Sequence, residues 1–66
     1  MSTKYPNIPV NLVGHDGNAF MVLARVCAEL RRAGISKDEI QQFRDEATAG
    51  DYAHLIGTVA DWVTVV

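Results

Sequence analysis

A single cysteine is the feature that most constrains how this chain of 66 residues can fold. Cys27 has no partner for an internal disulfide, and a domain of this size buries only about 60% of the surface that its unfolded chain exposes. The fold must therefore depend on one compact core or on burial between subunits. A lone cysteine suits a reducing compartment, so we expect a cytoplasmic protein in which Cys27 is a small core residue and not a reactive thiol.

The apolar pattern predicts a single α+β domain with the element order β-α-α-α-β. Residues 1–7 are polar and are expected to form a flexible tail, and residues 8–66 to form the domain. Alternating apolar residues predict a strand over 8–13, with Pro9 at its beginning or on a sheet edge. The β-branched run 63–66 predicts a second strand, paired with the first and packed with it on three short helices.

The first helix is expected over about 17–33, between a cap at Asp16 and the chain-reversing Gly34. Apolar residues at spacings of three and four predict its buried face, made of Phe20, Leu23, Ala24, Cys27 and Leu30. If Phe20 is fully buried, its replacement by alanine should cost about 3–5 kcal/mol.

Cap residues also mark the other two helices. Ser36 with Glu39 forms a capping box flanked by the hydrophobic staple Ile35 and Ile40, which predicts a helix over about 37–49. Its inner face is expected to contain Ile40, Phe43 and Ala47. Asp51 is predicted to cap a third helix, whose apolar residues follow helical spacing: Tyr52, Leu55, Val59 and Trp62 or Val63.

Composition and charge exclude several classes of function. The net charge of −2 lacks the attraction for phosphate backbones on which generic nucleic-acid binding depends. No apolar run reaches the length of a signal peptide or of a membrane span. His15 beside Asp16 has no nucleophile to activate, and His15, His54 and Asp51 lack the spacing of metal ligands, so we expect no catalytic residue, no metal and no cofactor.

The turn between the first strand and the first helix is the candidate ligand site, because the N–H groups of a helix N-terminus favour anions. It contains His15, Asp16, Gly17 and Asn18. Three arginines on the following helix, Arg25, Arg31 and Arg32, could face this turn from another subunit and hold a phosphorylated small molecule. The alternatives are an ordinary capped turn and a solvated charged face.

Two strands alone are marginal in water, so the chain is expected to complete its fold in a homo-oligomer. A terminal strand rich in valine is also a template for strand addition from a partner protein. The candidate interface residues are Tyr52, Trp62, Val63 and Val65.

Several segments carry a resemblance to a known family. They are VNLVG at 10–14, DGNAF at 16–20, RRAG at 31–34, ATAGDY at 47–52 and WV at 62–63. The chain resembles a family of very short proteins of phages and mobile elements, built from a strand, a DGNAF helix start, an SGDY turn and a terminal strand. Ala49 stands where that pattern has serine.

The resemblance implies a compact accessory protein of a mobile genome, whose task is to trap a small signal or to block a host protein. Together with the candidate site it favours a non-enzymatic, anti-defence protein that sequesters an anionic, nucleotide-like signal in a homo-oligomer. The alternative is a protein-binding inhibitor or adaptor of a host protein, which uses an edge strand or a helix face.

Overall fold

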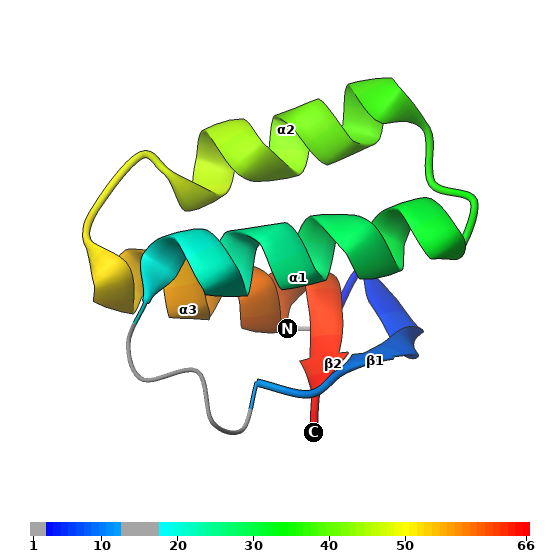
Figure 1. The fold of residues 1–66 in the computed structure, drawn as a ribbon, viewed down its shortest axis with the longest axis horizontal. Helices are drawn as coiled ribbons and strands as arrows, with labels where there is room; N and C mark the ends of the chain where they lie inside the picture. The colour runs from blue at the N-terminus through cyan, green and yellow to red at the C-terminus, as the bar shows by residue number, and fades with distance from the viewer. Residues whose placement is uncertain (1–2, 13–17) are drawn as a thin grey trace.

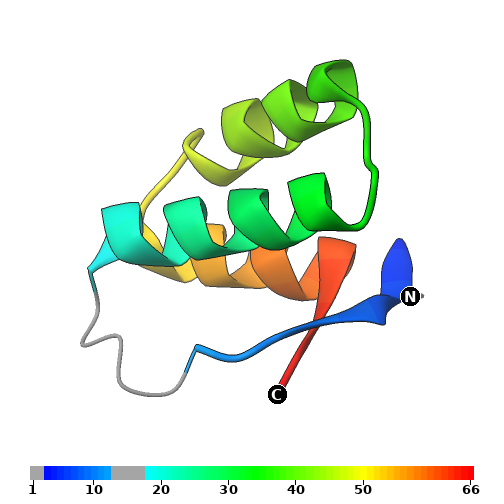
Figure 2. The same cartoon turned by 45° about the vertical axis from the view of Figure 1, so that its right-hand side comes forward.

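The computed structural model describes residues 3–12 and 18–66 and has the predicted β-α-α-α-β order. The elements are β1 (Tyr5–Val10), α1 (Ala19–Arg32), α2 (Lys37–Ala47), α3 (Tyr52–Trp62) and β2 (Val63–Val65). Helix α2 lies on one side of α1 and α3, and the two strands lie on the other (Figure 1). A turned view shows the same order (Figure 2). The α+β fold predicted from the sequence is confirmed.

The strands pair in parallel, because three helices carry the chain back to the end of the sheet at which it started. Tyr5 pairs with Val63 and Val10 with Val65, and the register is irregular between Tyr5 and Pro9. Such an irregularity accommodates a proline, which has no N–H for the ladder.

Strand β1 begins at Tyr5, three residues before the predicted start at Ile8, and ends at Val10. The residues just before it are also bonded to the end of α3. Thr3 Oγ1 donates to the carbonyl of Ala60 at 3.1 Å, and the Lys4 N–H to that of Asp61 at 2.8 Å. Residues 3–7, expected to belong to the tail, therefore join the sheet and the end of α3.

One apolar core joins all five elements. It contains Ile8, Val10, Val22, Val26, Leu30, Ile40, Phe43, Ala47, Leu55, Val59, Trp62 and Val63. The predicted inner face of α2 is confirmed, since Ile40, Phe43 and Ala47 are all buried.

The predicted inner face of α1 is wrong for Phe20 and Ala24, which are exposed, whereas Leu23 and Cys27 are partly buried against the core. Leu30 is buried as predicted, but the other buried residues are Val22 and Val26, whereas Phe20 is 83% exposed. Helix α1 carries two apolar rows that share an edge, and the spacing of three and four fits both. Contacts with β1, α2 and α3 select the valine row, and the row that contains Phe20 faces outward.

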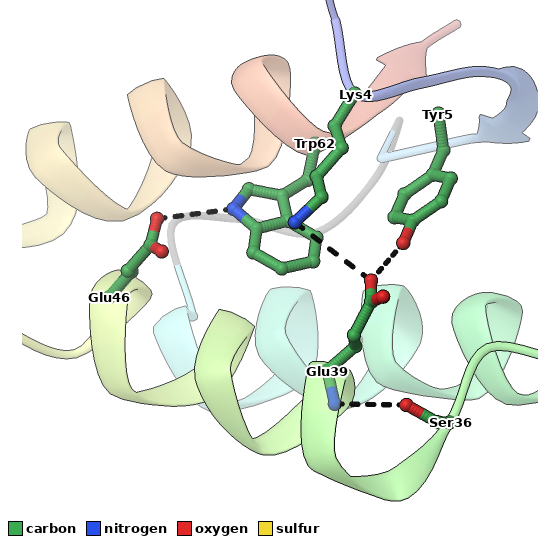
Figure 3. A network of polar contacts seen from close by, with 6 residues as sticks. All are labelled: Lys4, Tyr5, Ser36, Glu39, Glu46 and Trp62. Atoms are coloured by element: carbon green, nitrogen blue, oxygen red, sulfur yellow. Dashed lines mark hydrogen bonds and ion pairs between the residues drawn. The ribbon is translucent and has the colours of Figure 1, made fainter.

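The ring of Trp62, at the end of α3, joins three elements (Figure 3). Phe43 of α2 meets it edge-on with ring centroids 5.5 Å apart, and Tyr5 of β1 lies at 6.0 Å. Lys4 Nζ lies 4.1 Å from the ring centroid, in a cation–π contact. The indole N–H donates to Glu46 Oε1 at 3.2 Å, which satisfies the one polar group of this buried side chain.

Glu39 connects the same cluster to the start of α2 (Figure 3). Its backbone N–H donates to Ser36 Oγ at 3.3 Å, which confirms the predicted cap. Its carboxylate accepts a hydrogen bond from the Tyr5 hydroxyl and lies 3.9 Å from Lys4 Nζ. A complete capping box would send this carboxylate back to the Ser36 backbone. Here it ties β1 to α2 instead.

Two phenylalanines test the assignment of the core. Phe43→Ala should lower the free energy of unfolding by about 3–5 kcal/mol, because it empties a fully buried site beside Trp62. The matched change Phe20→Ala should cost less than about 0.5 kcal/mol, because Phe20 is exposed. Urea unfolding at low protein concentration measures both. A large loss from Phe20→Ala would contradict the observed face of α1.

The contact between Tyr5 and Glu39 predicts a dependence of stability on pH. The hydrogen bond to Glu39, with burial and the negative charge of that carboxylate, raises the pKa of Tyr5 above 10.0. Because the folded pKa exceeds the unfolded one, Tyr5 stabilises the fold below about pH 10, and this contribution is lost as the pH rises through the folded pKa. Tyr5→Phe should therefore be less sensitive than the wild type to rising alkalinity in thermal unfolding.

Lys4 is present in both proteins of that comparison, so its own titration cancels in the difference between them. Equal losses of stability above pH 10 in the wild type and in Tyr5→Phe would show that Tyr5 gains nothing from Glu39.

Candidate functional site

Asn18 acts in the structure as the N-cap of α1. Its Oδ1 accepts from the backbone N–H groups of Phe20 and Met21 at 3.1 and 3.2 Å. The cap is thus Asn18 and not the predicted Asp16, and two of the N–H groups that an anion would use are already bonded. The other predicted ligand residues of this turn, His15, Asp16 and Gly17, lie outside the described residues.

The three predicted arginines do not gather at that turn. Arg31 and Arg32 lie at the opposite end of α1, about 20 Å from Asn18 at the helical rise of 1.5 Å per residue. Arg32 pairs with Glu29 at 3.4 Å, and Arg25 is exposed in the middle of the helix. Within one subunit the turn and the arginines therefore form no common site.

Arg31 instead joins two other cations in a groove between the end of α1 and α2. This basic groove has a volume of about 490 Å³ and is lined by Arg31, Ile35, Lys37, Ile40, Gln41 and Arg44. Its size falls in the range of small-molecule sites, about 300–1,000 Å³. The isoleucines supply apolar surface, and the Gln41 amide nitrogen donates to Asp45 at 2.9 Å, which leaves its carbonyl oxygen as an acceptor.

The cations of the basic groove have no acidic partner within the part of the chain that the structure describes. Of the six lysines and arginines in the sequence, Lys4 pairs with Glu39 and Arg32 with Glu29. Within residues 3–12 and 18–66 no ion pair is formed by the others, which are Arg25, Arg31, Lys37 and Arg44. Three of these four unpaired cations line the same groove, although the protein as a whole is acidic.

Two of these cations affect the pKa of Cys27. Burial raises the pKa of the Cys27 thiol, and the guanidinium groups of Arg44 and Arg31 act in the opposite direction. Both guanidinium groups are thus close enough to favour a negative charge at this position. The thiol itself is half-buried against the core, as predicted.

Two polar residues of this groove, Gln41 and Arg44, were not singled out from the sequence, whereas Lys37 was expected near Arg31 at the end of the first helix. Lys37, Gln41 and Arg44 are spaced by four and three, which places them on one face of α2. That spacing was visible in the sequence. The proximity of Arg44 to Arg31 could not be predicted from the sequence, because it depends on how α1 and α2 pack.

A second hollow, of about 210 Å³, lies where the start of α1 meets the turn between α2 and α3. Its lining includes Phe20, Leu23, Leu55 and Tyr52, and Asp51 brings a carboxylate to it. No lysine or arginine lines it. This hollow therefore suits an apolar group better than an anion.

The turn that precedes α3 is explained by local packing. A Cβ on Gly50 would meet the Cβ and Cγ of His54 at 2.9 Å, so this position requires glycine. Asp51 Oδ1 accepts from the His54 N–H at 2.9 Å, which confirms Asp51 as the cap. His54 Nε2 lies 2.8 Å from the Glu46 carbonyl, to which it donates. Gly50 and Asp51 of the AGDY segment thus have structural roles.

The four predicted interface residues divide into two pairs. Trp62 and Val63 are buried in the core of the subunit, so neither is available to a partner. Tyr52 and Val65 are 39% and 44% exposed. The backbone of Val66 is already bonded to β1, since its N–H donates to the Val10 carbonyl at 3.0 Å.

Among the described residues, no group of three or more histidine, cysteine, aspartate or glutamate side chains is arranged to hold a metal ion. In the same part of the chain the longest helix, α1, has 14 residues, and no helix is long and apolar enough to cross a membrane.

The role of Asn18 as a cap can be tested by its stability effect. Asn18→Ala should lower the free energy of unfolding by about 1 kcal/mol, because it removes the acceptor for two N–H groups of α1. Asn18→Asp keeps an oxygen acceptor and should retain most of the stability. Thermal unfolding of both variants checks this, and an unchanged midpoint for Asn18→Ala would contradict the capping role.

Comparison of the chain with models of protein families, with curated proteins and with solved structures found no match.

Proposed function

We propose that this protein is a non-enzymatic binding protein for a small phosphorylated, nucleotide-like ligand, which it holds in the basic groove between α1 and α2. The observation that carries the proposal is the grouping of Arg31, Lys37 and Arg44 around one groove, with no acidic partner among the described residues. Unpaired cations that converge in a protein of net charge −2 attract an anion locally, where the molecule as a whole repels it.

The chemistry of the lining favours a ligand with a phosphate and a less polar part. Arginine presents a planar fork that matches two phosphate oxygens, and lysine adds a compact third charge. Ile35 and Ile40 provide apolar surface in the same groove, and the free Gln41 oxygen can accept from an N–H or O–H of the ligand. A nucleotide-like molecule contains all of these complementary groups.

The biological role that we propose is sequestration of a signal, consistent with the accessory proteins of phages and mobile elements that the sequence resembles. The protein would then lower the free concentration of the ligand by binding it stoichiometrically, without altering it chemically. The alternative, a protein partner added to the terminal strand, has weaker support. β2 has three residues, its first is buried, and the N–H of Val66, which follows the strand, already donates to Val10 of β1.

Calorimetry with a panel of cyclic dinucleotides and ADP-ribose derivatives tests the proposal. At least one compound should bind, and raising the salt concentration should weaken its binding. Arg31→Gln and Arg44→Gln should each raise the Kd about tenfold, because each removes one charged donor to phosphate. Arg25→Gln is the matched control, since Arg25 forms no ion pair with the described residues and lies outside the groove, and it should change the Kd less than about twofold.

Two results would contradict the proposal. One is the absence of binding across the panel. The other is an equal loss of affinity in Arg25→Gln and Arg44→Gln, because that would reflect overall charge and not the groove.

A further inference from the structure

The basic groove continues past Arg44 along the surface of α1. Arg44 also lines a neighbouring hollow of about 250 Å³, whose other lining residues are Phe20, Leu23, Ala24 and Cys27. Phe20 and Leu23 in turn line the hollow of about 210 Å³ at the turn before α3. Shared residues thus join the basic groove and these two hollows into one row, which we call the trough.

The trough follows the length of α1. Phe20, Ala24, Cys27 and Arg31 are spaced by four, three and four, which places them on one face of the helix. At 1.5 Å per residue, about 10 Å separate Phe20 from Cys27 along the helix axis, and about 6 Å separate Cys27 from Arg31. Arg44 meets this row from α2, which runs antiparallel to α1 (Figure 1). The trough therefore has a basic end and an apolar stretch that leads away from it to Phe20.

The far end of the trough contains groups that complement a nucleobase. Phe20 of α1 and Tyr52 of α3 line it, and they are 83% and 39% exposed, so each offers an aromatic ring on which a base can stack. Asp51 Oδ1 caps α3, and the other oxygen of this carboxylate can accept from the amino group of adenine or cytosine. No lysine or arginine lines this end, so a phosphate belongs at the other.

The order of charges along the trough selects its occupant. A single nucleotide with its phosphate at Arg44 fills the trough on one side of that residue only. A ligand with a nucleoside on each side of its phosphate fills both, because apolar surface is present in the basic groove and again at Phe20. An alkyl chain also matches the apolar stretch, but it would cover the Asp51 carboxylate without offering it a donor, which is costly.

We propose that the ligand is an extended, linear dinucleotide, two nucleosides joined through phosphate, which lies along the trough. Its phosphates bind Arg31 and Arg44, and one base lies on the isoleucines of the basic groove. The other base stacks on Phe20, with its amino group at Asp51. The far end of the trough is an addition to the basic groove, so this proposal rests on the proposed function.

Two ligands with the same pyrophosphate test the presence of a second base site. Diadenosine diphosphate carries a base at each end, whereas ADP-ribose carries one base only. In calorimetry the wild type should bind diadenosine diphosphate about tenfold more tightly than ADP-ribose, because only the former has a second base to stack. Arg44→Gln should weaken the binding of both ligands about tenfold, because both use its charge.

Phe20→Ala tests the position of the second base. It removes the stacking surface, so the variant should bind the two ligands with dissociation constants within about twofold of each other. Met21→Ala is the matched control, since Met21 is 51% exposed on the same helix but lines none of the three hollows. This control should keep the preference of the wild type. Circular dichroism establishes that each variant is folded.

Three results would overturn the assignment of a linear dinucleotide. Equal binding of the two ligands by the wild type is the first, and it would leave the proposed function intact if Arg44→Gln still weakens both. A preference that persists in Phe20→Ala is the second, because the second base would then lie elsewhere. The third is dodecyl phosphate binding as tightly as diadenosine diphosphate, which would assign the trough to an alkyl chain. Failure of both nucleotides to bind would contradict the proposed function as well.

Discussion

Burial of Trp62 is the interaction on which the arrangement of this small domain depends. The ring lies where α3 ends and β2 begins, and Phe43, Tyr5 and Lys4 contact it from α2, from β1 and from the residue before β1. A domain without a disulfide has few large side chains with which to join its layers. The indole of Trp62 joins the layers because it contacts three segments, and Glu46 accepts a hydrogen bond from its N–H.

The charges of the chain divide between two tasks. Lys4 and Arg32 are paired with carboxylates, and Lys4 also lies over the Trp62 ring, so these cations belong to the fold. Arg31 and Arg44 are left without acidic partners in the part of the chain described, and both approach Cys27. A fold seldom gathers like charges without a compensating anion, because their repulsion costs stability. This cost is the physical basis for assigning an anionic ligand to the groove.

Helix α1 shows why an amphipathic pattern alone does not identify the core. Val22 and Val26 point inward with Leu30, while Phe20 and Ala24 point outward, yet both rows have the spacing of an apolar helix face. The larger residue, Phe20, looked like the better core residue by size. The side of α1 that faces β1, α2 and α3 decides which row is buried, and the size of a side chain does not.

The sequence by itself determined the order of the elements, the caps at Ser36 and Asp51 and the inner face of α2, because these depend on contacts within a few residues of the chain. Tertiary structure decided the rest. Strand β1 starts at Tyr5 and not at Ile8 because Tyr5 meets Trp62 and Glu39, which are far away in sequence. The buried row of α1 and the meeting of Arg31 with Arg44 likewise depend on how helices pack, which local spacing cannot encode.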